Sequence, residues 1–302
     1  MIAISVVVPS WNTCALLRAC LEGLERAEKP ECEVIVVDNG SDDGSADMVA
    51  EHFPAATLIQ NERNEGYAKA CNQGIEASGG SYVLLLNSDA VVAGDALVLL
   101  YRFLEEHERY AAVAPRLVAP DGTTQKSLKR FPTLKTALFF ATPLERWFPR
   151  SRELARYLMR DDDQESDRDV EQPPAACLLL RRKALCEVGV FDESLWLFYN
   201  DVDLSKRLAA AGWRTRYLAD ARVVHHEGAS TSKLPFLVPI WQGDRLRYYR
   251  KHHGRLGGLW LKLCVTLAFL DWSLLQLGLR LRRRGGERVG PMARSFGAFL
   301  LQ

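Results

Sequence analysis

The chain has 302 residues, of which 48% are hydrophobic and 25% are charged. This composition allows a substantial buried core, so the chain need not be disordered or fibrous, and the length suits one large α/β domain with appendages. The formal net charge is only +1, but residues 233–302 hold 13 Lys and Arg against 3 Asp and Glu. Such a basic segment predicts contact with something anionic, either a membrane surface or a polyanion. The 7 scattered cysteines form no Cys-x-x-Cys pair and predict reduced thiols in a cytoplasmic protein.

Apolar segments of strand length recur along the first third of the chain, and each precedes a turn and a helix-like segment. The predicted strands cover residues 4–8, 33–37, 56–59 and 82–86. Leucines at helical spacing predict helices over 16–24 and 97–104. Short, nearly continuous apolar strands are typical of parallel strands that are covered on both faces. The alternation of strand and helix therefore predicts the α/β class, with right-handed crossovers.

The pattern is interrupted over residues 119–174, which contain a basic stretch at 126–130 and an acidic run at 161–169. We interpret this segment as a partly flexible insertion that could close over a substrate. The pattern resumes with a predicted strand over 176–180 and a short helix over 183–188.

Polar residues follow several of the predicted strands. Pro9 to Asn12 come after the first, Asp38 to Ser45 after the second and Asn87 to Asp89 after the fourth. Ligands of open α/β sheets bind outside these carboxyl ends. A carboxylate there can accept a hydrogen bond from a base or ribose, or can hold Mg²⁺ or Mn²⁺ together with substrate phosphates. Taken alone, each motif also fits a turn or a helix cap.

Two further motifs lie in the second half. Asn200-Asp201-Val202-Asp203 opens a predicted helix, where acidic residues are ordinary capping, but the preceding aromatic side chains have faces on which sugars pack. His225 and His226 end another predicted strand. An imidazole beside a phosphate site can ligate a metal, although a lone histidine is usually a satisfied polar residue.

The order of the motifs is more specific than any single motif. Four of them resemble the GT-A glycosyltransferases of family 2: SVVVPSWN (5–12), VVDNGSDDGS (36–45), NEGYAKACNQGI (64–75) and LNSD (86–89). Three more resemble its bacterial rhamnosyltransferase-like branch: GVFDE (189–193), FYNDVDL (198–204) and HHEGAS (225–230). The resemblance covers about residues 2–255.

The resemblance implies a GT-A fold, which is a Rossmann-like nucleotide-binding mixed sheet flanked by helices. It implies a nucleotide-sugar-binding half over 1–118 and an acceptor-binding, catalytic half over 119–232 that contains the insertion 119–174. Residues 233–302 would then form a basic helical C-terminal extension.

The implied activity is that of an inverting, metal-dependent glycosyltransferase in bacterial cell-surface polysaccharide synthesis, with Asp201 as the catalytic base. Asp89 and His225 would ligate Mg²⁺ or Mn²⁺. The residues implied in binding the nucleotide sugar are Pro9, Trp11, Asn12, Asp38, Asn64, Gly66, Asn72, Asn87 and Ser88. Those implied in binding the acceptor are Trp196, Tyr199 and Asn200.

The implied donor is a dTDP- or UDP-sugar carrying rhamnose or another hexose, and the acceptor is a glycan or a lipid-linked molecule. Asn200 stands where the family usually has Glu beside the catalytic Asp. This loss of charge leaves open a catalytically impaired sugar-nucleotide-binding protein. A nucleic-acid binder is a third alternative, but the basic tail lacks a recognisable nucleic-acid module, so we expect no nucleic acid as partner.

Residues 256–281 form an apolar run long enough to span a membrane, yet it contains Lys262 and Asp271. Polar residues that share one face of a helical wheel favour a helix lying in the membrane interface. They are Lys262, Thr266, Ser273, Gln276 and Arg280. Asp271 falls opposite, and arginines within 280–288 favour peripheral contact with anionic lipid on the inner face of the cell membrane. A helix that packs on the domain or on a partner subunit is the alternative.

Overall fold

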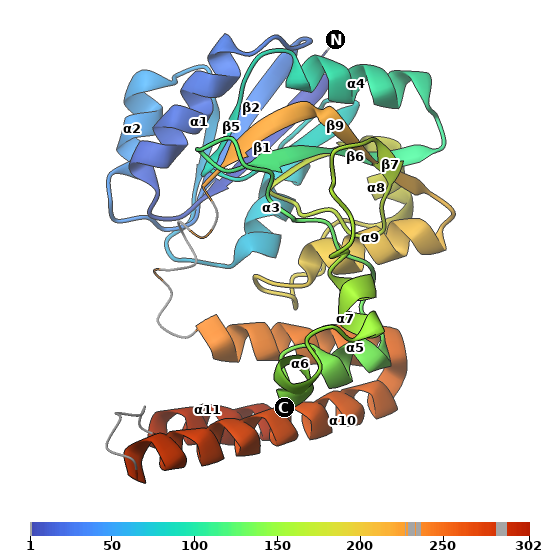
Figure 1. Ribbon diagram of the computed structural model, residues 1–302. Coiled ribbons are helices and arrows are strands. Elements are labelled where there is room, and N and C mark those ends of the chain that lie inside the picture. Colours follow the sequence, from blue (N-terminus) through green and yellow to red (C-terminus); the bar gives the residue numbers. More distant parts are fainter. Residues whose placement is uncertain (1, 227, 229–232, 234–236, 282–288) are drawn as a thin grey trace. The chain divides into compact units, whose positions relative to one another are not determined.

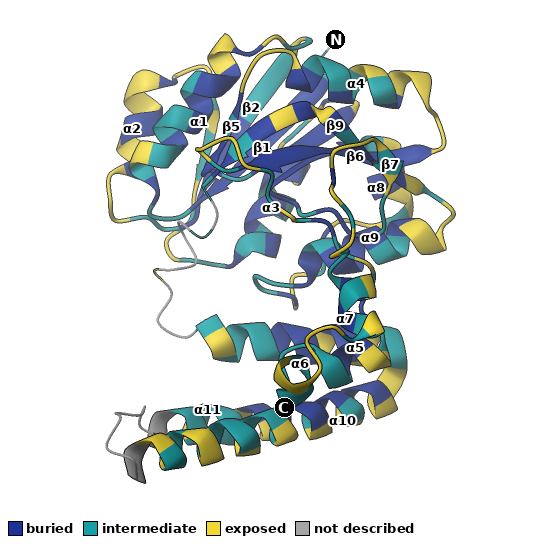
Figure 2. Cartoon of the chain, in the orientation of Figure 1, coloured by how far each residue is buried: buried dark blue, intermediate teal, exposed yellow. Residues whose placement is uncertain are grey.

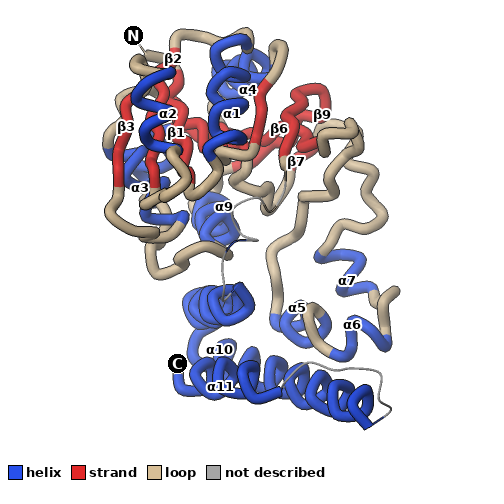
Figure 3. Tube along the Cα trace, turned by 90° about the vertical axis from the view of Figure 1, so that its left-hand side faces the viewer, coloured by secondary structure: helices blue, strands red, loops and turns tan. Residues whose placement is uncertain are grey.

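The computed structural model describes residues 2–226, 228, 233, 237–281 and 289–302 (Figure 1). The chain forms two compact units. The first, here called the α/β unit, contains Met1–Lys129 and Asp162–Pro235, and the second, the helical unit, contains Arg130–Asp161 and Phe236–Gln302. Strands are confined to the α/β unit among the described residues, as the colouring of Figure 3 shows.

A mixed sheet forms the centre of the α/β unit. Its strands are β1 (Ile4–Ser10), β2 (Cys32–Asp38), β3 (Thr57–Gln60), β4 (Tyr82–Leu86), β5 (Ala90–Val92), β6 (Tyr110–Val118), β7 (Arg168–Asp169), β8 (Cys177–Arg181) and β9 (Arg214–His225). Their spatial order is β3-β2-β1-β4-β8-β6-β9-β5, and β7 pairs with β9. The first four strands are parallel, whereas β8 runs antiparallel to both β4 and β6.

Helices cover both faces of this sheet (Figure 1). They are α1 (Cys14–Arg26), α2 (Ser45–His52), α3 (Tyr67–Glu76), α4 (Ala96–Glu106), α8 (Arg182–Val188) and α9 (Asn200–Ala210). Leu84 of β4 packs in a core with α1, α2 and α4, while its neighbour Leu85 packs in a core with α3, α8 and α9. Because successive side chains enter opposite cores, the strand is apolar without interruption, and the predicted α/β class is confirmed.

The segment predicted as one insertion over 119–174 is divided between the two units. Its first residues stay with the sheet, since Gln125 N donates to the carbonyl of Leu117 at 2.9 Å. Its last residues form β7, which pairs with β9. Arg130–Asp161 instead belongs to the helical unit, together with the C-terminal segment. Two short helices of this middle part pack on the long C-terminal helix.

The helical unit contains α5 (Leu134–Phe139), α6 (Pro143–Trp147), α7 (Arg152–Tyr157), α10 (Leu237–Leu281) and α11 (Val289–Leu301). Gly254, with φ of 68° and ψ of −173°, breaks α10 into two helical halves. Arg245 is 1% exposed, and its guanidinium carbon lies 5.0 Å from the ring centre of Trp241. Its Nη2 donates to the carbonyl of Phe140 at 3.1 Å, while Tyr249 Oη donates to the carbonyl of Thr133 at 2.9 Å. These contacts join α10 to the segment around α5, and they give the unit a core of its own.

The predicted C-terminal extension is helical, as expected. Within the described ranges, one helix, Leu237–Leu279 of α10, is long and apolar enough to cross a membrane, with a mean hydropathy of 1.5 over an 18-residue window. The core helix of a soluble protein passes the same test, so length and composition alone do not place α10 in a bilayer. The basic cluster predicted at 282–288 lies outside the described residues.

Candidate active site

A pocket of about 390 Å³ opens in the α/β unit at the carboxyl ends of β1, β4 and β9. The sheet topology brings together eight of the predicted site residues there: Pro9, Asn87, Ser88, Asp89, Tyr199, Asn200, Asp201 and His225. The other predicted site residues do not line this pocket: Trp11, Asn12, Asp38, Asn64, Gly66, Asn72 and Trp196.

Asp89 and His225 meet because β5 pairs with β9. Ala90 is opposite His225 in the register of this antiparallel pair, and the N–H of His226 donates to the carbonyl of Asp89 at 2.9 Å. His225 Nε2 consequently lies 3.3 Å from Asp89 Oδ1, with both side chains largely buried. The three-residue strand β5 was not predicted, because a segment this short carries no readable pattern.

Gln125 fixes the orientation and tautomer of His225. Its Nε2 donates to the His225 carbonyl at 2.8 Å, so its Oε1 must be the atom that faces His225 Nδ1, at 3.0 Å. An amide oxygen only accepts hydrogen bonds, and Nδ1 therefore carries the proton. In the neutral imidazole, Nε2 then presents a lone pair toward Asp89. Gln125 was missed at the sequence level, since nothing around it distinguishes it from a loop residue.

The arrangement of Asp89 and His225 fits a divalent cation. Asp89 Oδ1 is buried and accepts no hydrogen bond from the described residues, and the same holds for Asn87 Oδ1 nearby. A buried acceptor without a donor is costly, and a cation is one group that would satisfy it. The described residues contain no cluster of three or more His, Cys, Asp or Glu side chains that could hold a metal. Two protein ligands are sufficient where phosphates and water complete the coordination of Mg²⁺.

Ser88 is held in place by a series of hydrogen bonds between buried hydroxyl groups. Its Oγ lies 2.8 Å from Thr13 Oγ1, which lies 3.0 Å from Ser10 Oγ. These hydrogen bonds tie the carboxyl end of β4 to that of β1. The turn that carries Ser88 and Asp89 is thereby held against the end of the first strand.

Asp201 lies in the first turn of α9 and lines the pocket. Burial raises the pKa of its carboxyl group, while a hydrogen bond from the backbone of Val202 and the charge of Lys129 oppose this shift. The N–H of Val202 donates to Asp201 Oδ1 at 2.8 Å. Asp203 of the same motif has a different role, because it is fully buried and pairs with Arg207 at 2.8 Å.

Asn200 holds the loop that presents Asp201. It is 3% exposed; its Nδ2 donates to the carbonyl of Leu197 at 2.8 Å and its Oδ1 accepts from the N–H of Asp201 at 2.7 Å. Tyr199, just before it, has the left-handed φ of 62° that turns the chain into α9. An ionised glutamate has no N–H to donate to Leu197. The loop is therefore built for the neutral amide at position 200.

Tyr67 lines the same pocket, although only its motif was noted from the sequence. Its hydroxyl donates to the carbonyl of Ala175 at 3.1 Å. Burial raises the pKa of Tyr67 well above its ordinary value, and the negative charges of Asp201 and Asp89 add to this effect. Tyr67 therefore stays neutral and remains a hydrogen-bond donor.

Asp38 ends β2 and is 3% exposed. Its Oδ2 accepts from the N–H of Ser41 at 3.1 Å, which is the turn geometry that the sequence also allowed. Its Oδ1 is buried without a hydrogen-bond donor from the described residues. Asn12, with φ of 54°, grips the same loop: its N–H donates to Ser41 Oγ at 2.9 Å and its Oδ1 accepts from Asp42 N at 2.8 Å. Trp11 precedes it in the turn and is half-buried.

Asn64 and Gly66 belong to a loop organised by Asn39. Asn64 Oδ1 accepts from Asn39 Nδ2 and from the N–H of Gly66, each at 3.0 Å. Gly66 has φ of +94°, and a Cβ there would lie 2.5 Å from the indole of Trp196. Only glycine permits this close approach.

The hydrogen bonds of Asn72 indicate a structural role. Its Nδ2 donates to the carbonyl of Phe191 at 2.9 Å and to Glu193 at 3.0 Å, while its Oδ1 accepts from the N–H of Phe191 at 3.0 Å. The amide therefore joins α3 to the loop before α9 instead of facing the pocket.

A mixed α/β sheet with an acidic pocket at the carboxyl ends of its parallel strands defines an enzyme of the nucleotide-binding α/β class. The sequence model of glycosyl transferase family 2 matches residues 5–189. The chain belongs to this family, and it is a glycosyltransferase.

Similar proteins agree with this assignment. An N-acetylglucosaminyl-diphospho-decaprenol L-rhamnosyltransferase of Mycobacterium tuberculosis is 30% identical over 241 residues, which cover 76% of this chain and 78% of the relative. A solved mannosyltransferase from Pyrobaculum calidifontis, in complex with GDP-Man and Mn²⁺, has a TM-score of 0.55 and 18% identity, covering 99% of this chain and 80% of that one. The structure of GalNAc-T7 with UDP, GalNAc and Mn²⁺ gives a TM-score of 0.62 and 16% identity, covering 83% and 48%. These two structures share the GT-A fold with this chain.

Proposed function

We propose that this glycosyltransferase is inverting and metal-dependent, and that it moves a sugar from a nucleoside diphosphate onto a hydroxyl group of an acceptor. The observation that carries the proposal is the gathering of Asp89, His225 and Asp201 around one pocket. A pocket with a carboxylate–imidazole pair and a separate desolvated carboxylate has both parts that such a transfer needs.

Asp89 and His225 would hold the cation, either Mg²⁺ or Mn²⁺. When bound, the cation supplies positive charge that offsets the charge gained by the departing diphosphate. Gln125 keeps the proton of His225 on Nδ1, so that Nε2 is available as a ligand. The Mn²⁺ in both solved structures of similar fold supports this part of the proposal.

Asp201 would accept the proton of the attacking hydroxyl group. Its raised pKa makes the carboxylate a stronger base than an exposed aspartate. Attack from the side opposite to the departing diphosphate inverts the anomeric carbon. Asn200 would position Asp201 through its backbone N–H. Trp196 and Tyr199 would provide the flat faces beside the acceptor.

The nucleotide would lie along the loops after β1 and β2. Asp38 Oδ1, which is buried and has no hydrogen-bond donor among the described residues, suits the N–H of a pyrimidine base such as thymine or uracil. Pro9, Trp11, Asn12, Asn64 and Gly66 would form the walls around it, with Asn87 and Ser88 near the phosphates. Asn72 would support this region indirectly through the loop at Phe191.

For the substrates, we propose rhamnose from dTDP as donor and a lipid-linked glycan as acceptor, in bacterial cell-surface polysaccharide synthesis on the cytoplasmic side of the membrane. The name of the mycobacterial relative supports this choice. Glucose, galactose or N-acetylhexosamine from UDP remain the alternatives. No nucleic acid takes part.

Thermal unfolding in the presence of nucleotide sugars tests the proposal. We expect dTDP-rhamnose to raise Tm more than UDP-sugars or GDP-mannose do, and we expect Mn²⁺ to increase this effect. A panel in which no nucleotide sugar raises Tm, with or without Mn²⁺, would contradict the proposed donor site.

A further inference from the structure

The second half of α10 has an unusual surface. Between Leu256 and Leu279, every exposed residue is a leucine, and Figure 2 shows the exposed stretches recurring along this helix. These leucines are Leu256, Leu259, Leu263, Leu267, Leu270, Leu274, Leu275, Leu277 and Leu279. Their exposed fractions run from 39% to 80%. All of them except Leu275 and Leu279 recur at helical spacing on one side of α10, and an apolar face of this kind marks an interaction surface.

The polar side chains of the same helix turn toward the unit's own helices. Lys262 Nζ donates to the carbonyl of Leu300 at 2.6 Å, and Asp271 pairs with Arg146 at 2.9 Å. Thr266 is half-buried and donates to the carbonyl of Lys262 at 2.8 Å. A helix on a water-facing surface has the opposite arrangement, with its polar stripe outward. Lys262 of the predicted polar stripe and Asp271 on the opposite side both contact protein, and the leucines that lie between them are left exposed.

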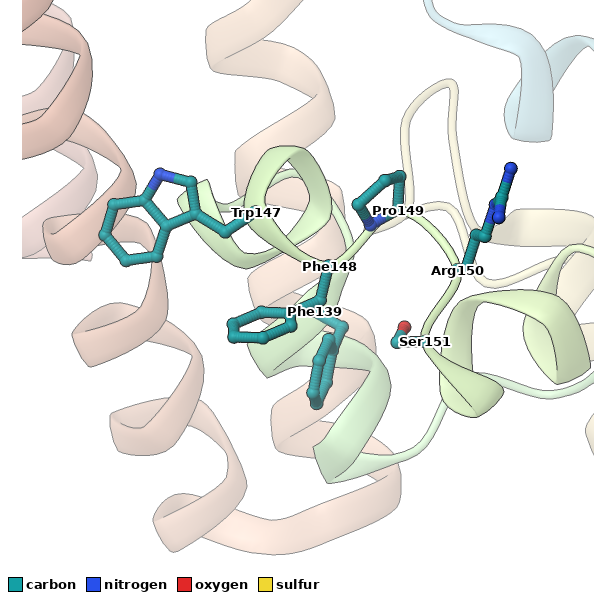
Figure 4. A pocket seen from close by; sticks show the side chains of 6 residues that line it. All are labelled: Phe139, Trp147, Phe148, Pro149, Arg150 and Ser151. Atoms are coloured by element: carbon teal, nitrogen blue, oxygen red, sulfur yellow. The ribbon is translucent and has the colours of Figure 1, made fainter.

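Exposed aromatic side chains lie on a neighbouring element of the same unit. Trp147 is 60% exposed and Phe148 is 56% exposed. Figure 4 shows Trp147 extending away from Phe148 and Phe139. The ion pair of Arg146 with Asp271 ties this end of α6 to the leucine-bearing half of α10. Tryptophan is enriched at the interface between membrane and water.

Charge distinguishes between the possible occupants of this face. The helical unit contains 19 Lys and Arg against 6 Asp and Glu, a formal charge of +13 in a chain whose total is +1. A second copy would bring +13 against +13, which repels. An anionic lipid surface attracts the same unit, because each basic residue close to the surface adds to the binding.

We propose that the leucine face of α10 docks the enzyme on an anionic lipid bilayer, with the helix lying along the membrane surface. The opposite face of α10 packs on its own unit through buried residues such as Leu261 and Cys264. The helix therefore cannot be surrounded by lipid, which excludes a simple span. Docking depends on neither the donor sugar nor the role of Asp201, so this proposal and the proposed function can fail separately.

Sedimentation of the full-length protein with lipid vesicles tests this proposal. We expect binding to vesicles of phosphatidylcholine mixed with phosphatidylglycerol, little binding to phosphatidylcholine alone, and weaker binding at high salt. A variant with Leu259→Gln, Leu263→Gln, Leu270→Gln and Leu274→Gln keeps good helix formers on exposed positions. It should bind anionic vesicles about 100-fold more weakly. Its thermal unfolding and its Tm shift with dTDP-rhamnose should match wild type.

The matched control is Val190→Gln, an equally polar replacement of an exposed apolar residue in the α/β unit, which should leave vesicle binding unchanged. Wild-type binding by the four-leucine variant would overturn the proposal. Equal binding to neutral and anionic vesicles would overturn the choice of anionic lipid. A wild-type dimer in light scattering, dissociated by the four glutamines and without vesicle binding, would show a second copy as the occupant.

Discussion

The two units use apolar residues in opposite ways. In the α/β unit, apolar side chains fill two cores on either side of the sheet, and the unit's formal charge is −12, the remainder of the chain total after the +13 of the helical unit. In the helical unit, nine leucines in the second half of α10 are exposed, while Lys262 and Asp271 of the same half contact protein. The comparison separates two tasks. The acidic unit holds the proposed catalytic groups, and the basic unit has the proposed surface for attachment.

Replacing Asp201, the proposed catalytic base, should have the largest effect, and that effect should be confined to the chemistry of the α/β unit. Asp201→Asn keeps the shape of the side chain but cannot accept a proton, and we expect kcat for transfer to fall by about 100-fold to 10,000-fold. The Tm shift with dTDP-rhamnose and Mn²⁺ should remain as in wild type, because Asp201 lies outside the proposed nucleotide site. Transfer at near wild-type rate would remove Asp201 from this role. The four-leucine variant is the control from the other unit, and with a soluble acceptor it should keep its kcat.

A replacement behind the metal site should have a smaller effect. Gln125→Leu removes the acceptor that holds His225 Nδ1. We expect the Mn²⁺ concentration for half-maximal transfer to rise about 10-fold to 100-fold, with kcat at saturating Mn²⁺ much less affected. Titration of transfer activity with Mn²⁺ measures both quantities. An unchanged Mn²⁺ dependence would mean that Gln125 supports only the loop at β9.

Replacing Asn200, the residue before Asp201, tests whether this chain is an active or a catalytically impaired enzyme. Asn200→Glu restores the residue that the family usually carries, but it replaces the N–H donor to Leu197 by a carboxylate. The carbonyl of Leu197 then loses this donor, the loop that presents Asp201 is less well held, and we expect kcat to fall about tenfold. Asn200→Gln, which keeps an amide, should lose less. A higher kcat in the Glu variant would instead favour the reading that this chain is catalytically impaired.

The smallest expected effect concerns pH. Because the pKa of Asp201 is raised in the folded state, transfer should decline with falling pH at a higher pH than the value of about 4 for an ordinary aspartate. The same shift makes the folded state bind more protons than the unfolded state, so ionisation of Asp201 lowers stability as pH rises through the folded pKa. Asp201→Asn should therefore have a Tm a few degrees higher at neutral pH and no advantage in acid. A lower Tm at neutral pH would contradict this assignment.

Much of the α/β unit follows from local sequence patterns. The strands β1 to β4, the strand β8 and the start of α9 lie where apolar runs and helical spacing predict them, because each is specified by its own residues. The contact of Asp89 with His225 depends on the pairing of β5 with β9, which links distant parts of the chain. Patterns within one segment contain no information about such pairing.

The helical unit was harder to predict for the same reason. The wheel of α10 shows that polar and leucine faces exist, but not which face meets protein. That choice depends on Arg146 and Leu300, which lie far from Lys262 and Asp271 in sequence. Gln125 likewise acquires its place behind His225 only through the fold. Sequence patterns therefore located the residues that line the pocket better than the residues that hydrogen-bond to them.

The central claim is metal-dependent transfer with inversion, and the anomeric configuration of the product tests it most directly. Nuclear magnetic resonance of the glycoside formed from dTDP-rhamnose, with Mn²⁺ and again after addition of a chelator, gives both answers in one reaction. We predict a product of opposite anomeric configuration to the donor, and no product once Mn²⁺ is chelated. A product that retains the donor configuration, or one that forms equally well with the chelator, would contradict the account.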